Sequence, residues 1–322
     1  MPSRYASHVF SRLLNGTVPE RGLDEIAVGV EKHRKELQRM LDEARRGSGD
    51  VKFLRGGYGC GKTFMATLAV QDAQEAKFAT SFVVVSDNDL HFHKFDELYR
   101  KVVGGLSTPA CPQGALGDIL DRWIGSLEEG LVELGVSEDD PDFDEKVLAK
   151  LDEQLAGLTQ GRAPADMTRA VFDDRRGVKG LEALYDRIKF ESFSGVASLR
   201  QPQLDLKPFD RDRLIRVALK VRSLHSDLAP EQAEARIPRA FIEQLADKVT
   251  EGFRGDVGVV PRQFLRTFAN IVDIIASDPE QDPFKLLQFT AKDLSPEEKA
   301  AVEGRPLETP PDDEFGGGTV EM

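Results

Sequence analysis

This sequence has few cysteines and no long hydrophobic run. The 322 residues include two cysteines, Cys60 and Cys111, which are far apart and lack the spacing of metal ligands. This pattern excludes a disulfide framework and is typical of a reducing cytoplasm. No apolar run approaches the roughly 18 residues that a membrane-spanning helix requires, and the charged N-terminal segment is unlike a secretory signal. We expect a cytoplasmic protein without a membrane segment.

Positive charge is also in short supply. The formal net charge is −13, which argues against general affinity for the nucleic-acid backbone. The distribution is uneven, because residues 115–160 hold 13 Asp+Glu against 3 Lys+Arg, and residues 199–225 hold 7 Lys+Arg against 3 Asp. Both stretches are typical of solvated helix faces. The alternative is that the basic stretch contacts DNA or a nucleotide phosphate, while the acidic stretch docks a partner.

Strand signals are few, and helical periodicity dominates the chain. Residues 51–54 ("VKFL") and 80–86 ("TSFVVVS") predict two strands, and the helix expected between them at 62–76 makes a βαβ unit with a parallel sheet. Further helices are expected at 30–46, 94–106, 114–134, 144–157, 210–224, about 237–252 and 261–276. In the last two helices the predicted core positions are Phe241, Leu245, Val249, Phe264, Phe268, Ile271 and Ile275.

A glycine-rich turn, "GGYGCGKT", lies between the first strand and the next helix. Gly56, Gly61, Lys62 and Thr63 satisfy the pattern G-x-x-x-x-G-K-[S/T] in the context that it requires. Glycines let backbone N–H groups converge on phosphates, the lysine adds a charge at the β- and γ-phosphates, and the threonine hydroxyl ligates Mg²⁺. An accidental glycine turn is the alternative, at odds of about 1 in 100 for a chain of this length. The expected nucleotide contacts are Gly56, Gly57, Tyr58, Gly59, Cys60, Gly61, Lys62, Thr63 and Phe64, with Thr63 at the metal.

Two nearby polar groups do not predict a metal site. Asp87 and Asp89 follow the second strand, but "SDND" favours a turn. His91 and His93 are two residues apart and have no third ligand nearby in the sequence.

Several stretches resemble one family of bacterial defence proteins. These are "ERGLDEIAVGVEKH", "VKFLRGGYGCGKTF", "FATSFVVVSDNDLHFHKFDELYRKVVGGL", "LRQPQLDLKPFDRDRLIRVALKVRSLH" and "VVPRQFLRTFANIVDII". Together they resemble the P-loop ATP-binding proteins of bacteriophage-exclusion (BREX) defence islands, of the smaller, BrxD type. The resemblance covers most of residues 17–290.

The resemblance implies an AAA+ ATPase related to origin-recognition and Cdc6-type proteins. It implies an α/β core with a C-terminal helical or winged-helix domain, and ATP with Mg²⁺ as cofactors. Ile26, Ala27 and Val28 would lie against the adenine base. Arg262 would act as sensor 2 at the γ-phosphate, and Arg187 as an arginine finger on a neighbouring subunit of a homo-oligomer. Other defence proteins, and DNA at the basic C-terminal domain, are the implied partners.

One expected element is missing from the sequence. Such ATPases have a buried strand ending in Asp-Glu, which holds Mg²⁺ and orients the attacking water. No run of four apolar residues followed by adjacent acids lies between Ser86 and Phe209, and the nearest match is "AVFDD", with Asp173 and Asp174. The chain thus breaks from the family pattern near 160–170. Either the protein has an internal deletion, or the printed sequence joins two stretches that a longer protein separates.

We expect a P-loop α/β core, incomplete in this sequence, followed by a helical domain. The expected divisions are an N-terminal segment (1–22), an ATPase domain with an acidic helical insertion (23–205), a lid domain (206–293) and a disordered acidic tail (294–322). The predicted function is that of a Mg-ATP-dependent switch or motor acting on DNA or partner proteins. The alternatives are a non-hydrolysing ATP-binding interaction module and a small-molecule P-loop kinase.

Overall fold

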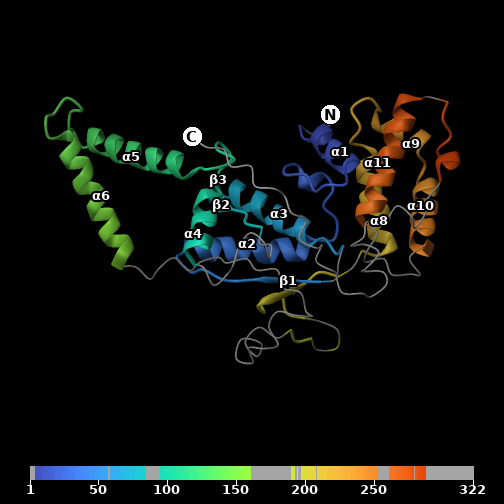
Figure 1. The fold of residues 1–322 in the computed structure, drawn as a ribbon, viewed down its shortest axis with the longest axis horizontal. Helices are drawn as coiled ribbons and strands as arrows, with labels where there is room; N and C mark the ends of the chain where they lie inside the picture. The colour runs from blue at the N-terminus through green and yellow to red at the C-terminus, as the bar shows by residue number, and fades with distance from the viewer. Residues whose placement is uncertain are drawn as a thin grey trace, which may run out of the picture. The chain divides into compact units, whose positions relative to one another are not determined.

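The structure is a computed structural model that describes residues 4–56, 59–84, 95–160, 190–192, 194, 197–207, 209–252, 261–278 and 280–287. It is a mixed α/β protein, rich in helix, with little sheet (Figure 1). The chain forms two compact units, each assembled from separate stretches. We call residues 29–55 and 62–205 the sheet unit, and residues 1–28, 56–61 and 206–322 the helical unit. The domain divisions expected from the sequence stay predictions.

The sheet unit contains a small parallel sheet. Strand β1 (Phe53–Arg55) pairs in parallel with β4 (Gln203–Asp205), with Leu54 opposite Leu204. Both leucines are buried, so this register places one hydrophobic pair at the centre of the sheet. The strand predicted at 51–54 is therefore confirmed at 53–54, with Val51 and Lys52 outside it, whereas its partner β4 was not predicted.

The second predicted strand, 80–86, is wrong over part of its length. Among its described residues, 80–84, Thr80–Ser81 form the strand β2. Strand β2 pairs antiparallel with β3 (Leu106–Ser107) and does not form the expected parallel unit with β1. Residues 85 and 86 lie outside the described residues. Residues 82–84 lie outside any strand, and Phe82 and Val84 are exposed. The physical reason is that β-branched residues favour a strand only where a neighbouring strand covers them.

Five helices are described in the sheet unit. They are α2 (Glu31–Arg45), α3 (Lys62–Glu75), α4 (Phe95–Gly104), α5 (Leu116–Glu133) and α6 (Phe143–Gln160). Arg34 of α2 binds the buried Asp72 of α3 through both of its carboxylate oxygens, at 2.6 to 3.1 Å. This two-pronged contact fixes α2 against the helix that follows the glycine-rich turn.

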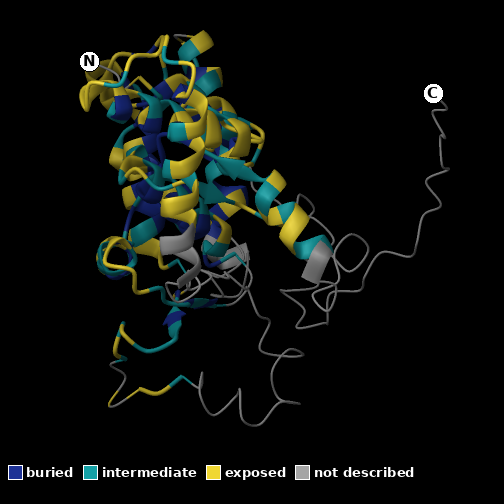
Figure 2. Cartoon of the chain, turned by 90° about the vertical axis from the view of Figure 1, so that its left-hand side faces the viewer, coloured by how far each residue is buried: buried dark blue, intermediate teal, exposed yellow. Residues whose placement is uncertain are grey.

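Most of the largest fully buried side chains among the described residues belong to the helical unit. Its elements are α1 (Ala6–Leu14), η1 (Leu23–Glu25), α8 (Arg211–Arg222), α9 (Pro230–Arg236), α10 (Arg239–Gly252), α11 (Pro261–Ser277) and η3 (Pro283–Leu286). Helix α8 packs on α10 and α11, and α1 packs on α11. Every core position predicted in the last two helices is buried. Figure 2 colours the chain by burial, and dark blue buried stretches alternate with yellow exposed turns along its helices.

Local signals explain where these helices start and stop. Asp210 caps α8 by accepting a hydrogen bond from the backbone N–H of Arg213 at 2.8 Å, and α9 starts at Pro230, whose fixed φ suits a first helical position. All the helices predicted from periodicity are confirmed, with ends shifted by a few residues. Helices α1 and α9 were not predicted.

Candidate functional site

The glycine-rich turn, which we call the glycine loop (residues 56–63), connects β1 to α3. Gly56, Gly59 and Gly61 have φ angles of +156°, +74° and +90°, a range that residues with a Cβ atom rarely adopt. Lys62 is half-buried and begins α3, and Thr63, beside it, is exposed. Gly57 and Tyr58 lie outside the described residues. The loop therefore has the strand–turn–helix context and the backbone conformations that its glycines predict.

Gly56 tolerates no side chain. A Cβ atom there would lie 2.8 Å from the backbone oxygen of Leu206 and in collision with Cys60 Sγ. Cys60 is 5% exposed, so its thiol packs against the loop's own backbone. Both contacts lie in the helical unit. The loop is thus tightly packed at its first residue, and the glycine is required both by φ and by space.

The start of α3 provides an anion-binding end. The first N–H groups of a helix have no partner within it, and the helix dipole adds a partial positive charge there. Glycines before such an end let an anion approach the backbone closely. Lys62 adds a full positive charge at the first turn. The first turn of α3 thus has the charge and the N–H donors that suit an anion.

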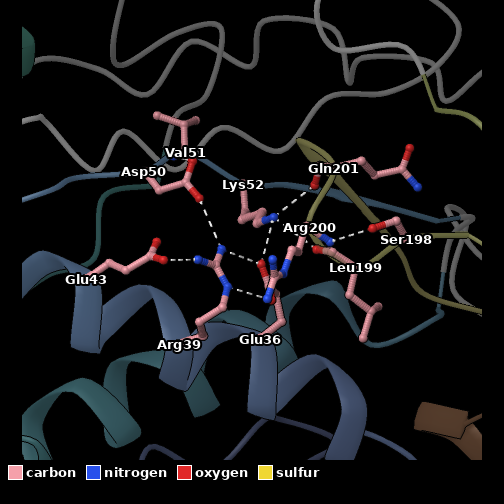
Figure 3. Close-up of polar contacts among 10 residues, drawn as sticks. All are labelled: Glu36, Arg39, Glu43, Asp50, Val51, Lys52, Ser198, Leu199, Arg200 and Gln201. Atoms are coloured by element: carbon pink, nitrogen blue, oxygen red, sulfur yellow. Dashed lines mark hydrogen bonds and ion pairs between the residues drawn. The ribbon is translucent and has the colours of Figure 1, made fainter.

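A buried ion pair supports the strand that leads into the loop (Figure 3). Lys52, just before β1, has a side chain 4% exposed, and its ammonium lies 3.0 Å from the carboxylate of Glu36 in α2. The same ammonium donates to the backbone oxygens of Leu199 and Gln201, at 3.0 and 2.9 Å. Lys52 therefore joins α2 and the turn before β4 to the beginning of β1.

A second cation, Arg39, also binds the Glu36 carboxylate. Arg39 donates two hydrogen bonds to the Glu36 carboxylate, at 2.7 and 3.0 Å, and also pairs with Glu43 and, at 3.6 Å, with Asp50 (Figure 3). Burial alone would raise the pKa of Glu36, but the hydrogen bonds from Arg39 and Lys52 outweigh it and hold the pKa below its usual value. Glu36 is thus kept ionised by two cations.

Ile26, Ala27 and Val28, the residues predicted to lie against adenine, follow the 3-10 helix η1. Ile26 and Val28 are buried, and Ala27 is half-buried. The Lys220 ammonium of α8 donates to the backbone oxygen of Ala27 at 2.8 Å and to that of Asp24 at 3.3 Å. Lys220 therefore fixes the backbone of this segment. No sequence pattern links Lys220 to Ala27, since nearly two hundred residues separate them.

Arg262 lies near the N-terminus of α11, as predicted, and is exposed. Its Nε donates to the backbone oxygen of Gly16 at 2.7 Å, just after the end of α1. A cation near a helix N-terminus is disfavoured by the dipole, and this carbonyl contact offsets that effect. The structure thus gives Arg262 a contact with the turn after α1 that the sequence did not indicate. Whether it senses a phosphate stays a prediction.

Much of the basic stretch at 199–225 is engaged within the helical unit. Arg211 pairs with Asp247, Arg216 with Asp212 at 3.0 Å, and Arg222 with Glu234 at 3.3 Å. Arg222 also donates to the backbone oxygen of Ile237, and Lys220 binds the segment described above. This favours the interpretation of α8 as an ion-paired helix face over a surface that contacts nucleic acid.

Several predicted residues cannot be compared with the structure. Arg187, Asp173, Asp174, His91 and His93 lie outside the described residues. Within the described ranges, no group of three or more His, Cys, Asp or Glu side chains is arranged to hold a metal ion. Cys60 and Cys111 are not joined by a disulfide.

The structure divides the predicted contacts between the two units. Gly56, Gly59, Cys60 and Gly61 belong to the helical unit, together with Ile26, Ala27, Val28 and Arg262. Lys62, Thr63 and Phe64 belong to the sheet unit. The chain passes from one unit to the other inside the glycine loop, at Gly61–Lys62.

Comparison with protein families gives a match over most of the chain. The family model described as "BREX system ATP-binding protein BrxC/D" matches residues 1–172 and 166–291. The two matched segments meet where the sequence departs from the expected pattern. No curated protein and no solved structure is significantly similar to the chain. Among the described residues, no helix combines the length and the apolar character needed to cross a membrane.

Proposed function

The chain belongs to the family of BREX system ATP-binding proteins, and from this premise we propose that it binds Mg-ATP at the glycine loop and acts as a nucleotide-driven switch or motor in antiphage defence. Lys62 would contact the β- and γ-phosphates, and the Thr63 hydroxyl would ligate Mg²⁺. When bound, the metal would neutralise charge on the phosphates. The backbone N–H groups at the start of α3 would cradle the same phosphates.

The glycine loop carries this proposal. It follows the parallel strand β1, Gly56, Gly59 and Gly61 have φ values of +74° to +156°, and Lys62 begins α3. A chance glycine turn would need neither positive φ angles nor a packed first residue. Family membership implies nucleotide binding independently of this geometry.

The remaining assignments extend the proposal. Ile26, Ala27 and Val28 would contact adenine, Arg262 would respond to the γ-phosphate, and Arg187 would act on a neighbouring copy in a cytoplasmic homo-oligomer of the AAA+ type. The partners would be other defence proteins or DNA. The ion-paired charges of α8 favour protein partners over DNA at that helix.

A non-hydrolysing ATP-binding module is the second candidate. The sheet that contains β1 has two strands in the described residues, and no strand there ends in the Asp-Glu pair that would orient a water. Asp173 and Asp174 are the nearest acidic pair in the sequence, and they lie outside those residues. Binding without turnover would make the protein a nucleotide-responsive adaptor.

Steady-state ATP turnover, with and without duplex DNA, separates the two candidates. A chain whose intact mass equals that of these 322 residues should bind Mg-ATP and hydrolyse it very slowly, because nothing identified positions the water. Lys62→Ala is the background control, since any turnover that survives this change does not come from the glycine loop.

Rapid turnover by the mass-verified chain would contradict the slow-hydrolysis prediction, and its loss in Asp173→Asn or Asp174→Asn would assign the missing role to that pair. Stimulation by DNA would make DNA the partner. Absence of both ATP binding and turnover would overturn the proposed function itself.

A further inference from the structure

The helices α5 and α6 form an acidic arm whose apolar face is covered over only part of its length. Near their shared loop, Leu131 of α5 packs with Phe143 and Val147 of α6, and all three are buried. Figure 1 shows the two helices meeting at this loop and running apart from it. The arm therefore has a small core at one end.

The face of α5 that carries Leu131 also has apolar side chains nearer the start of the helix, and there they are exposed. Leu116, Leu120 and Ile124, which we call the α5 stripe, are spaced by four residues and so lie on one row of the helix. They are 38%, 41% and 36% exposed. The helical positions of Leu127 and Leu131, which are buried, fall on the same side. One continuous apolar face is thus buried at one end and exposed at the other.

Helix α6 adds exposed apolar side chains to the arm. Leu148 is 59% exposed and Leu155 is 40% exposed. Scattered apolar residues are common on protein surfaces, but rows at helical spacing on two adjacent helices are typical of surfaces that receive a further helix. Burying the α5 stripe would require an element lying along α5.

The negative charge of the arm limits which kind of partner can bind along the α5 stripe. Residues 115–160 contain 13 acidic and 3 basic residues. All three basic residues are already paired within the arm: Arg122 with Asp118, Lys146 with Asp140 and Lys150 with Glu153, at 3.0, 2.6 and 3.1 Å. Ten carboxylates (13 − 3) therefore remain in excess of the local cations. Nucleic acid and anionic membranes would be repelled, as would a second acidic arm.

We propose that the α5–α6 arm docks a basic amphipathic helix of a partner protein, which covers the α5 stripe with apolar side chains and pairs its flanking Lys or Arg residues with the arm's carboxylates. The apolar row supplies the area to be buried, and the excess negative charge supplies the selectivity for a cationic helix. This docking does not depend on the glycine loop.

Trp123 provides a built-in reporter of docking. It is the single tryptophan of the chain, and it lies beside Ile124 on α5, where its indole donates to Gln154 of α6 at 2.8 Å. We would titrate the full-length protein with a synthetic amphipathic helix of leucine and lysine and follow tryptophan emission. A helix of the same pattern with glutamate in place of lysine is the matched probe of opposite charge.

We expect the basic peptide to shift Trp123 emission and to bind more weakly as salt is raised, while the acidic peptide does not bind. Leu120→Ser should weaken binding of the basic peptide about tenfold, because a buried leucine is lost from the interface. Val132→Ser is the control, since Val132 is on α5 and 42% exposed but lies off the stripe. Circular dichroism checks that both variants keep their helix content.

If wild type and Leu120→Ser bind the basic peptide with equal affinity, the proposal is wrong, because binding would then depend on charge alone and not on the α5 stripe. Binding of both peptides with the same affinity would overturn the basic character of the partner. A wild-type dimer in sedimentation that Leu120→Ser dissociates would also overturn it, by assigning the stripe to a second copy of this chain.

Discussion

Lys52 and Glu36 form an ion pair at 3.0 Å in which both side chains are almost fully buried, at 4% and 6% exposure. A charge taken from water into a protein interior is tolerated only when partners compensate it, and here each charge has several. The pair lies at the entry to β1, the strand that leads into the glycine loop. Its loss should therefore affect stability, with a dependence on pH.

The pH dependence follows from Glu36. Its pKa is held below the ordinary value of 4.5 by Arg39 and Lys52 against the opposing effect of burial. A depressed pKa contributes stability that is complete above about pH 5 and is lost as pH falls through the folded-state pKa. The difference in unfolding free energy between wild type and Glu36→Gln, measured by urea denaturation, should be about 3 kcal/mol near pH 7 and shrink below pH 4.5.

Glu43→Gln is the matched control for this measurement. Glu43 pairs with Arg39 from the same helix, but its side chain is 37% exposed. An exposed pair contributes about 1 kcal/mol or less, so this variant should stay close to wild type. The account of the buried pair is wrong if both variants lose the same small amount of stability at every pH.

Gly56→Ala tests the packing of the glycine loop. The added Cβ would meet the backbone oxygen of Leu206 at 2.8 Å and collide with Cys60 Sγ, at a residue whose φ is already +156°. We expect Mg-ATP affinity to fall about tenfold or more, because a distortion of 1 to 2 kcal/mol at the phosphate contacts is enough for that loss. Isothermal titration calorimetry measures it.

Gly47→Ala is the control that separates the effect of a strained φ angle from the effect of a steric collision. Gly47 also has a positive φ, +81°, but a Cβ there has open space around it. It should cost stability by about 1 kcal/mol without affecting nucleotide affinity. Wild-type ATP affinity in Gly56→Ala would show that the loop does not need its packed first residue for binding.

Arg262→Ala tests the link between α11 and the nucleotide. Removing the guanidinium takes away the hydrogen bond to Gly16 and should cost about 1 kcal/mol of stability. If Arg262 also responds to the γ-phosphate, the variant should lose affinity for ATP and keep nearly the same affinity for ADP. The ratio of ATP affinity to ADP affinity should therefore decrease. Competition titrations with both nucleotides give this ratio.

Arg266→Ala is the control for Arg262, because Arg266 is one turn further along α11, is exposed and also lies beside Gly16. It should leave the nucleotide ratio unchanged. A ratio that is also unchanged in Arg262→Ala would restrict Arg262 to its structural contact with Gly16.

Helix periodicity made most of this fold predictable. The stripes of α10 and α11, with Phe241 and Phe264 among them, are buried as expected, since one apolar face fixes which side of a helix meets the core. Helix α1 had the same signal, with Ala6, Val9, Phe10 and Leu13 buried, and was overlooked. Pro230, at the first position of α9, was a further unused signal.

Short strands and long-range contacts were not predictable. Strand β4 has three residues and one buried side chain, Leu204, which is too little pattern to distinguish a strand from a loop. Residues 80–86 have strong β propensity, yet propensity does not determine which other strand a segment pairs with. Contacts such as Arg262 with Gly16 join residues 246 positions apart, and nothing local in the sequence encodes them. The glycine loop was the exception, because its motif is contiguous in the sequence.

The most direct test of the account is calorimetric titration of Mg-ATP into wild type and Lys62→Ala, with Lys35→Ala as a control for losing an exposed lysine. Lys62 is proposed to make a charge-assisted contact with the phosphates, so its removal should weaken binding about 10- to 100-fold, while Lys35→Ala binds as wild type does. Equal Mg-ATP affinity in wild type and Lys62→Ala would contradict the assignment of the glycine loop as the nucleotide site.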